Sequence, residues 1–189
     1  MSQELIDPRM LDSSVALGAH DGSALTSLNA GFTQGTEQAT TSGTSVTFSG
    51  LPSGVQMIIV NIAGFSSSAA NYGPLVQIGD AGGIETTSYD SLGGTTTGNS
   101  HTAVTTGFPT GDTNRYEAAG VCSGSFILTL EDAAAFTWVC QAMLCQVGGT
   151  ATMGFGTGNK SLSAELTQVR FTTVAGSTFD AGAANIMYI

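Results

Sequence analysis

Residues 123–145 read SGSFILTLEDAAAFTWVCQAMLC, and the secondary structure of this stretch decides the fold class of the chain. Two interpretations fit its apolar pattern. As a helix, the stretch would begin at an Asp132 cap and carry one apolar stripe, formed by Phe136, Val139, Cys140, Met143 and Leu144.

As a β-hairpin, the same stretch would line one face of its first strand with Phe126, Leu128 and Leu130. The second strand would present alternate apolar residues to that face, namely Phe136, Trp138, Cys140, Ala142 and Leu144. Aromatic and β-branched residues favour strands over helices, and the second half of the stretch is rich in them. We therefore predict the hairpin.

A second apolar stretch, SVTFSGLPSGVQMIIVNIAGF at residues 45–65, predicts two strands joined by a Pro-Gly turn. The second of these strands has apolar residues on both faces. One face carries Val55, Met57 and Ile59, and the other carries Ile58, Val60 and Ile62. We expect this strand to be central in its sheet and covered on both sides.

Shorter strand signals fill the rest of the chain, at 75–78, 84–89, 103–108, 151–155, 163–174 and 184–189, and a polar loop is expected at 91–102. Roughly ten short strands at hairpin spacing predict an all-β fold, an antiparallel two-sheet β-sandwich. Within this class we expect a jelly-roll-like topology, preceded by an extended N-terminal arm.

The composition excludes several classes of partner. The chain has 14 acidic residues against 4 Lys and Arg, and its formal net charge is −10. Phosphate backbones and anionic lipids are bound by clustered basic residues, whereas Arg9, Arg115, Lys160 and Arg170 are scattered along the sequence. We expect no nucleic-acid partner. The longest apolar run, MIIV, is a strand core, so we also expect no membrane insertion.

Few residues could support catalysis. His20 and His101 have no acid or nucleophile at a recognisable spacing, and no phosphate-binding, dinucleotide or zinc motif is present. The chain has an odd number of cysteines, three, and its opening MSQELIDPRM lacks the pattern of a secretion signal. Both observations favour a protein made in a cytoplasm, with its cysteines reduced. Cys140, beside Trp138, should have a raised pKa and little reactivity. We predict a protein that is no enzyme and needs no cofactor.

Two turns and one loop contain polar groups that could bind a ligand. GDAGG at 79–83 and FDAG at 179–182 could offer oxygens to calcium, but Asp and Gly are also ordinary turn formers, and we predict no metal. The densest polar loop is PTGDTNRYE, which holds Asp112, Asn114, Arg115, Tyr116 and Glu117. Its aromatic ring, amides and carboxylates would suit a receptor sugar. We favour an ordinary subunit contact over that alternative.

The start of the chain differs from the remainder. Residues 1–18 carry Leu5, Ile6, Met10 and Leu11 without enough apolar neighbours for a core of their own, so these side chains need a partner surface. Residues 19–43 have the Gly, Ser and Thr composition of a flexible connector. We therefore divide the chain into an anchoring arm at 1–18, a connector at 19–43 and a sandwich at 44–189.

The phrase DGSALTSL at residues 21–28 resembles one that recurs in bacteriophage tail-fibre sequences, just ahead of a C-terminal globular head. Four later segments resemble that head and cover most of residues 44–189: TSVTFSGLPSGVQMIIVNIAGFSS, LVQIGDAGGIETTSYDS, ILTLEDAAAFTWVCQAML and LTQVRFTTVAGSTFDAGAANIMYI. The resemblance implies a homotrimeric sandwich without catalytic residues, which acts in virion architecture or in adhesion to the host surface.

Carried over to this chain, the resemblance implies a virion protein whose arm binds a capsid or tail protein and whose head is displayed, with a host-surface glycan as the candidate receptor. About thirty residues precede the sandwich and span at most roughly 100 Å, so a short fibre or knob is expected rather than a long fibre. The alternatives are a capsid decoration or cement protein without a receptor role, and a stand-alone carbohydrate-binding module or small hydrolase.

Overall fold

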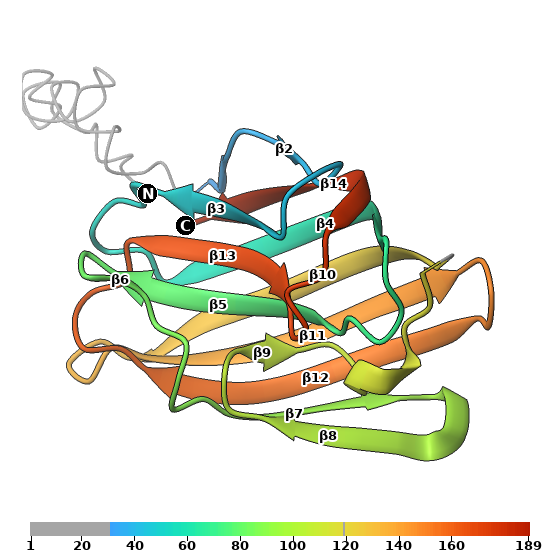
Figure 1. Ribbon diagram of the computed structural model, residues 1–189. Coiled ribbons are helices and arrows are strands. Elements are labelled where there is room, and N and C mark those ends of the chain that lie inside the picture. Colours follow the sequence, from blue (N-terminus) through green and yellow to red (C-terminus); the bar gives the residue numbers. More distant parts are fainter. Residues whose placement is uncertain (1–30, 119) are drawn as a thin grey trace, which may run out of the picture. The chain divides into compact units, whose positions relative to one another are not determined.

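The computed structural model describes residues 31–118 and 120–189. The predicted arm, with Leu5, Ile6, Met10 and Leu11, and the first part of the predicted connector lie outside the described residues. The described chain forms two antiparallel sheets that pack face to face (Figure 1), which confirms the all-β, two-sheet sandwich.

The larger sheet has nine strands. In spatial order it contains β1 (Thr33–Gln34), β14 (Phe179–Tyr188), β4 (Met57–Ser67), β10 (Val121–Asp132), β11 (Thr137–Val147), β12 (Thr152–Ser161), β7 (Asp90–Thr95) and β8 (Ser100–Val104), with β2 (Gln38–Ala39) also paired to β14. The smaller sheet has five strands: β3 (Ser45–Ser49), β13 (Gln168–Thr173), β5 (Pro74–Asp80) and β6 (Gly83–Ile84), with β9 (Phe108–Pro109) paired to β5. Two short 3₁₀ turns, η2 (Thr97–Asn99) and η3 (Thr113–Arg115), complete the described elements.

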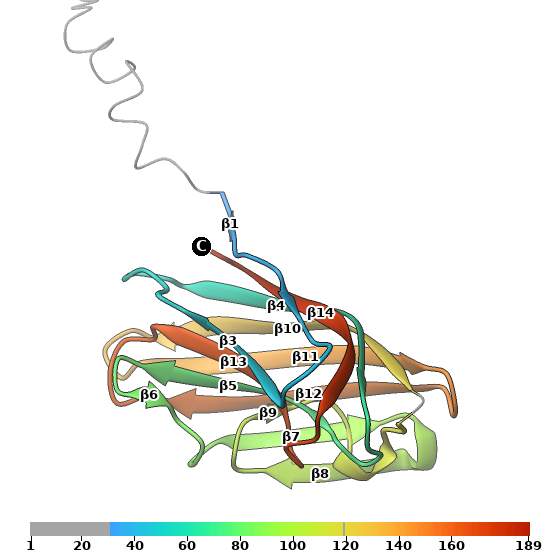
Figure 2. The same ribbon diagram turned by 45° about the horizontal axis from the view of Figure 1, so that its top comes forward.

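The chain crosses repeatedly between the two sheets, as Figure 2 shows. β3, β4 and β5 alternate between the smaller and the larger sheet, and so do β8, β9 and β10, and β12, β13 and β14. This alternation is compatible with the expected jelly-roll-like topology. The β5–β6 and β7–β8 pairs and the β10–β11–β12 meander depart from it, because their strands stay within one sheet.

The stretch at 123–145 is a hairpin, as predicted. In the β10–β11 pair, Phe126 lies opposite Ala142 and Leu128 opposite Cys140, and all four side chains are buried between the sheets. Asp132, the cap of the alternative helix, instead accepts the Ala134 and Ala135 backbone N–H groups at 2.8 and 3.2 Å. It therefore closes the hairpin turn and begins no helix.

β4 pairs with β14 on one side and β10 on the other, so its predicted central position is confirmed. Its inner side chains, Ile58, Val60 and Ile62, are buried in the core. On the outer face Met57 and Ile59 are only half-buried among the described residues. The expectation that both faces are covered is wrong for the described part of the chain, because the smaller sheet covers only the inner face.

Residues 91–102 form no loop but the greater part of the β7–β8 hairpin. Their Gly and Thr content hid the strands, because glycine is usually depleted in strands. Here close packing requires it: a Cβ on Gly93 would lie 2.4 Å from the Gly111 carbonyl oxygen.

The sandwich also begins before residue 44. Both β1 and β2 pair with β14, and the buried Thr40 donates its hydroxyl to the Ala181 carbonyl oxygen at 2.8 Å. Residues 33–43, assigned to the connector, therefore belong to the larger sheet and its margin, since strand pairing outweighs their linker-like composition.

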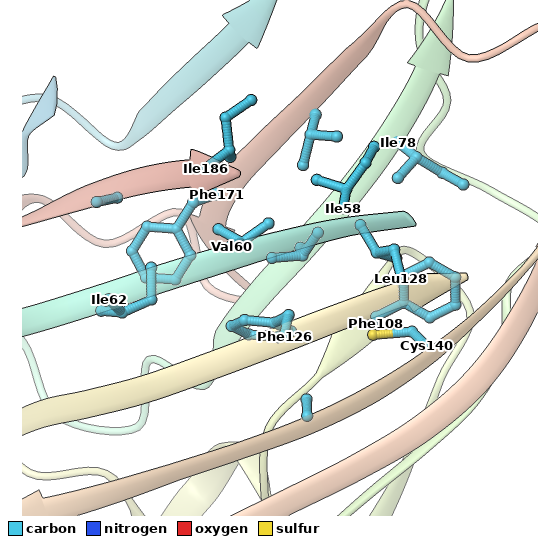
Figure 3. Close-up of a cluster of buried hydrophobic side chains, with 14 of the residues drawn as sticks. Ile58, Val60, Ile62, Ile78, Phe108, Phe126, Leu128, Cys140, Phe171 and Ile186 are labelled. Atoms are coloured by element: carbon cyan, nitrogen blue, oxygen red, sulfur yellow. The ribbon is translucent and has the colours of Figure 1, made fainter. Parts of the chain in front are cut away.

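The core lies between the sheets, where side chains from β4, β10 and β11 meet those of β13, β5 and β9 (Figure 3). Aromatic rings make up much of it: Phe65 contacts Phe171 and Phe179 edge to face, each at 4.9 Å between ring centroids. Since the core fills the space between the sheets, function has to be sought on the loops and the two outer faces.

Candidate functional site

The polar loop at 110–117 is bound to the rest of the sandwich by its own side chains. The Asp112 carboxylate accepts the hydroxyl of Ser100, the hydroxyl of Thr102 at 2.9 Å and the Asn114 N–H at 3.1 Å. Burial would raise the Asp112 pKa, but these hydrogen bonds outweigh it and hold the pKa below its ordinary value. The carboxylate thus joins η3 to β8, and its oxygens already accept hydrogen bonds from within the protein.

Tyr116 is fully buried, and its hydroxyl donates to the Thr110 carbonyl oxygen at 2.6 Å. Its ring therefore packs in the core and is not presented to a sugar, as the receptor interpretation required. The Glu117 carboxylate accepts the Thr150 N–H at 3.1 Å, and hydrogen bonding there lowers its pKa. Asn114 and Arg115 remain exposed, beside a cavity of about 350 Å³. The structure thus brings the five predicted residues together in one loop, where Asp112, Tyr116 and Glu117 form hydrogen bonds within the protein.

Two cysteine thiols lie in the core. Burial raises the pKa of Cys140 well above its ordinary value, as expected from its place on the apolar strand, and raises that of Cys122 to about 11. Cys145 is half-buried, on the outer side of β11. The core thiols are therefore poor nucleophiles.

The carboxylates of the two Asp-Gly segments bond within the protein. Asp80 accepts the Gly82 N–H at 2.7 Å and the Ser163 hydroxyl at 2.5 Å, and so stabilises the turn after β5. The turn expected at 179–182 is wrong, because these residues pair with β4 as the start of β14, and Asp180 accepts the hydroxyl of Ser66 on β4. His101 is exposed on β8, while His20 lies outside the described residues. Within the described ranges, no three His, Cys, Asp or Glu side chains cluster in a way that could hold a metal ion.

The outer face of the larger sheet carries many exposed apolar side chains. Eight residues that point away from the core form what we call the apolar face: the exposed Leu92, Val121, Ile127, Met143, Val147, Met153 and Phe155, and the half-buried Ile59. Cross-strand register makes them neighbours, since Ile59 lies opposite Ile127, and Phe155 lies opposite Met143. Met143 is 56% exposed and Phe155 49%, although both are large apolar side chains.

The apolar face also lacks charge. Along its five strands in the described chain, exposed charged residues occur only at strand ends, at Glu131 and Asp132 where β10 ends and at Asp90 where β7 begins. Lys160, the one charged residue of β12, is buried and pairs with Glu85 at 2.5 Å. Uncharged polar side chains lie between the apolar ones, since Gln141 lies opposite Ile127 and Ser125 opposite Met143. Isolated exposed apolar residues are ordinary, whereas many of them on one uncharged face are typical of interaction surfaces.

The outer face of the smaller sheet is polar and holds a groove of about 540 Å³. Arg170 of β13 lies opposite Gln77 of β5 and Thr47 of β3. Its Nε and Nη2 both donate to the Gln77 Oε1, at 2.8 and 2.6 Å, and the Gln77 Nε2 donates to the Thr106 carbonyl oxygen at 2.7 Å. We call this the arginine groove.

Sequence reasoning missed both outer faces. It treated Arg170 as one of four scattered basic residues, although the alternation in QVRFTT at 168–173 places Gln168, Arg170 and Thr172 on one face. That alternation was the available signal for the groove. The apolar face had no comparable local signal, because its residues come from strands far apart in the sequence.

No protein-family model matches the chain, and no curated protein or solved structure is significantly similar to it. Among the described residues, no helix has the length and apolarity needed to cross a membrane.

Proposed function

We propose that the chain is a non-enzymatic structural subunit of a bacteriophage particle, anchored by residues 1–18 to a capsid or tail protein and displaying the sandwich as its head. The resemblance of DGSALTSL and the four later segments to tail-fibre sequences supports the viral assignment. The observation that carries the structural role is the apolar face, because an uncharged sheet face of this size favours an oligomer over a monomer.

The size of the apolar face is adequate for assembly. It extends over five adjacent strands, from β4 to β7. With strands about 4.8 Å apart and outward residues about 6.7 Å apart along each strand, it measures about 24 Å by 20–25 Å, a footprint of roughly 500–600 Å² that includes the polar residues between the apolar ones. A specific interface buries about 800 Å² on each partner and should bury at least about 500 Å² on each. Copies of the chain that meet through this face and its margins reach that range.

Charge favours the same surface. Each copy carries a net charge of −10, so two copies repel each other wherever their acidic surfaces meet. Contact through a face without charges keeps the carboxylates at the rim, in water. We therefore propose that the apolar faces surround the axis of a homotrimer, the state that the tail-fibre resemblance implies.

The native mass of the full chain tests the assembly. A homotrimer has three times the mass of the 19.1 kDa chain. A dimer would retain the apolar face as an interface and contradict the trimer. A monomer at every concentration up to about 100 μM, well above the range of stable oligomers, would contradict assembly through this face altogether.

Deleting residues 1–18 tests the anchor. The shortened protein should keep the number of subunits of the full-length oligomer, because the sandwich begins at Thr33. It should no longer join particles when supplied in place of the full chain. In a trimer, the second and third arms bind after the first has already brought them close to the particle, so their binding is effectively intramolecular. Deleting all three arms therefore removes far more affinity for the particle than one isolated arm would supply. Normal incorporation of the shortened protein would contradict the anchoring role.

A decoration or cement protein without a receptor role is the alternative within the same class. It would share the apolar face and the anchor, and its head would bind no saccharide. Binding of a saccharide by the head would distinguish the displayed head from an inert decoration.

A further inference from the structure

We propose that the arginine groove binds a saccharide that carries a single carboxylate, with Arg170 as the residue that pairs with the acid. The proposed function supplies the source of the sugar, a host-surface glycan, while the site itself rests on the groove alone. It lies on the smaller sheet and shares no lining residue with the cavity beside the polar loop at 110–117, for which a subunit contact was expected.

Arg170 is held in a fixed orientation. Its neighbours along β13, Val169 and Phe171, are both fully buried in the core, which fixes the backbone beneath it. Two of its N–H groups donate to one oxygen of Gln77, and Gln77 is buried and fixed in turn by the Thr106 carbonyl. A guanidinium that is already held in its binding orientation loses little conformational entropy when it binds a ligand.

The guanidinium has donors to spare. Arginine carries five N–H donors, and the contacts with Gln77 engage two of the three groups that bear them, Nε and Nη2. Both donors of Nη1 and the second donor of Nη2 form no hydrogen bond with the residues described. Two parallel N–H groups on one edge are the arrangement that a carboxylate binds with both oxygens.

The charge of Arg170 is uncompensated within the described chain. Arg115 lies 3.8 Å from an Asp112 oxygen and Lys160 lies 2.5 Å from Glu85. No carboxylate of the described residues comes within 4.0 Å of Arg170, whose partner is the neutral amide of Gln77. Among the residues that the structure describes, Arg170 is therefore the cation that an external anion can pair with.

The lining of the groove suits a sugar ring. Six residues with hydroxyl side chains line it: Thr44, Ser45, Thr86, Thr106, Thr172 and Thr173. The Thr172 hydroxyl donates to the Thr44 carbonyl oxygen and the Thr173 hydroxyl accepts the Ser177 N–H, so the other four are the ones left for a ligand. Val174, 40% exposed, adds an apolar patch for the C–H face of a ring. The volume of about 540 Å³ is within the range of small-molecule sites, roughly 300–1,000 Å³.

The ligand should carry one negative charge. The described lining holds Arg170 as its one cation, whereas phosphate groups and polyanions are bound by several cations or by rows of backbone N–H groups. The net charge of −10 further disfavours a densely charged polymer. A uronic acid or another monocarboxylate sugar meets both conditions.

Titration of the full-length protein with three probes tests the proposal: glucuronic acid, glucose and acetate, followed by calorimetry or by chemical shifts in NMR. Glucuronic acid should bind at least 10-fold more tightly than either of the others, since only it uses both the guanidinium and the hydroxyls. Its affinity should fall with added salt. Equal binding of glucose and glucuronic acid would overturn the role of the carboxylate, and binding of none of the three would overturn the site.

Arg170→Gln should weaken glucuronic acid binding about 10- to 100-fold, the range expected for a lost charge-assisted pair. Arg115→Gln is the matched control, because it removes an exposed arginine from the polar loop and should leave binding unchanged. Loss with Arg115→Gln alone would move the site to that loop and overturn the proposal.

Ser45→Asp provides a second variant in case Arg170→Gln does not fold. Ser45 is exposed on the margin strand β3, so the change should leave the core intact, and the new carboxylate would compete for the guanidinium. Unchanged affinity in a folded Ser45→Asp variant would contradict the site. Neither variant touches the apolar face, so the native mass should stay that of the wild type, and failure of sugar binding is distinguishable from failure of assembly.

Discussion

The two outer faces of the sandwich differ in chemistry although the same kind of strand builds both. On the larger sheet, outward positions carry Ile127, Met143 and Phe155, and charge is confined to strand ends. On the smaller sheet, outward positions carry Arg170, Gln77 and threonines. Both sheets contribute buried side chains to the same core, so the core does not account for this difference.

The difference indicates two kinds of contact. A broad apolar face gains free energy by excluding water over a large area, which suits a second protein surface. A groove with one oriented cation and several hydroxyls gains specificity from a few directed bonds, which suits a small polar ligand. We infer that the larger sheet faces other subunits and the smaller sheet faces the surroundings.

Placing charge on the apolar face should have the largest effect. Met143→Lys combined with Phe155→Lys should convert the oligomer to monomer, because buried lysines without partners cost several kcal/mol. Native mass measured across a concentration series detects the change. Val174→Lys is the control, since Val174 is 40% exposed but belongs to the other side of the sandwich. Equal dissociation of both variants would show that the apolar face has no special role.

Overpacking the inner side of β12 should reduce stability, whereas trimming its outer side should not. A Cβ on Gly156 would lie 1.9 Å from the Pro109 carbonyl oxygen, so Gly156→Ala should cost about 1–3 kcal/mol. Thr157→Ala, next along the strand and exposed, should change the free energy of unfolding by less than about 0.5 kcal/mol. Urea denaturation of both variants provides the comparison. Similar losses would mean that the outer face also contributes to folding.

Cys145 provides a reporter of contact on the apolar face. It lies on the outer side of β11, opposite Met153 of β12, and should be protected from alkylation in the oligomer. In the Met143→Lys, Phe155→Lys variant it should react about 10-fold faster or more, as expected for an uncovered thiol. Mass spectrometry after brief iodoacetamide treatment measures the difference.

Cys122 and Cys140 are the internal controls for this labelling. Both are buried, and burial raises the pKa of Cys122 to about 11, so neither should react while the sandwich is folded. A Cys145 that is alkylated equally fast in oligomer and variant would contradict coverage of the face.

The smallest effect should come from acid acting on the smaller sheet. The Ser163 hydroxyl and the Gly82 N–H lower the pKa of Asp80 below its ordinary value of 3.8. A carboxyl whose pKa is lower in the folded state than in the unfolded state stabilises the fold at any pH above the unfolded-state pKa. This stabilisation is lost as the pH falls through the folded-state pKa.

Wild type should therefore exceed Asp80→Asn in the free energy of unfolding by about 1 kcal/mol near neutral pH. The gap should close below pH 3.8. Urea denaturation between pH 2 and pH 6 measures it. A gap that stays constant over this range would contradict the role of the charged carboxylate.

Local patterns carried the correct part of the prediction. Alternation of Phe126, Leu128, Trp138 and Cys140 with their neighbours was enough to predict a hairpin and hence an all-β sandwich. The β7–β8 hairpin was missed because its glycines are required by contact with Gly111 and Phe155, which are distant in sequence. The polar loop was found, but the burial of Tyr116 was not, since it depends on packing against Tyr72.

The sequence by itself determined which side chains point inward and which outward along each strand. Alternation is a property of the extended backbone and needs no knowledge of neighbours. Only the tertiary structure decided which strands lie side by side. Pairing joined Arg170 to Gln77 across 93 residues and set Ile59 beside Ile127. Strand order depends on contacts between residues that are far apart in the sequence. Each outer face combines residues from several such strands, so the two faces exist only in the folded protein.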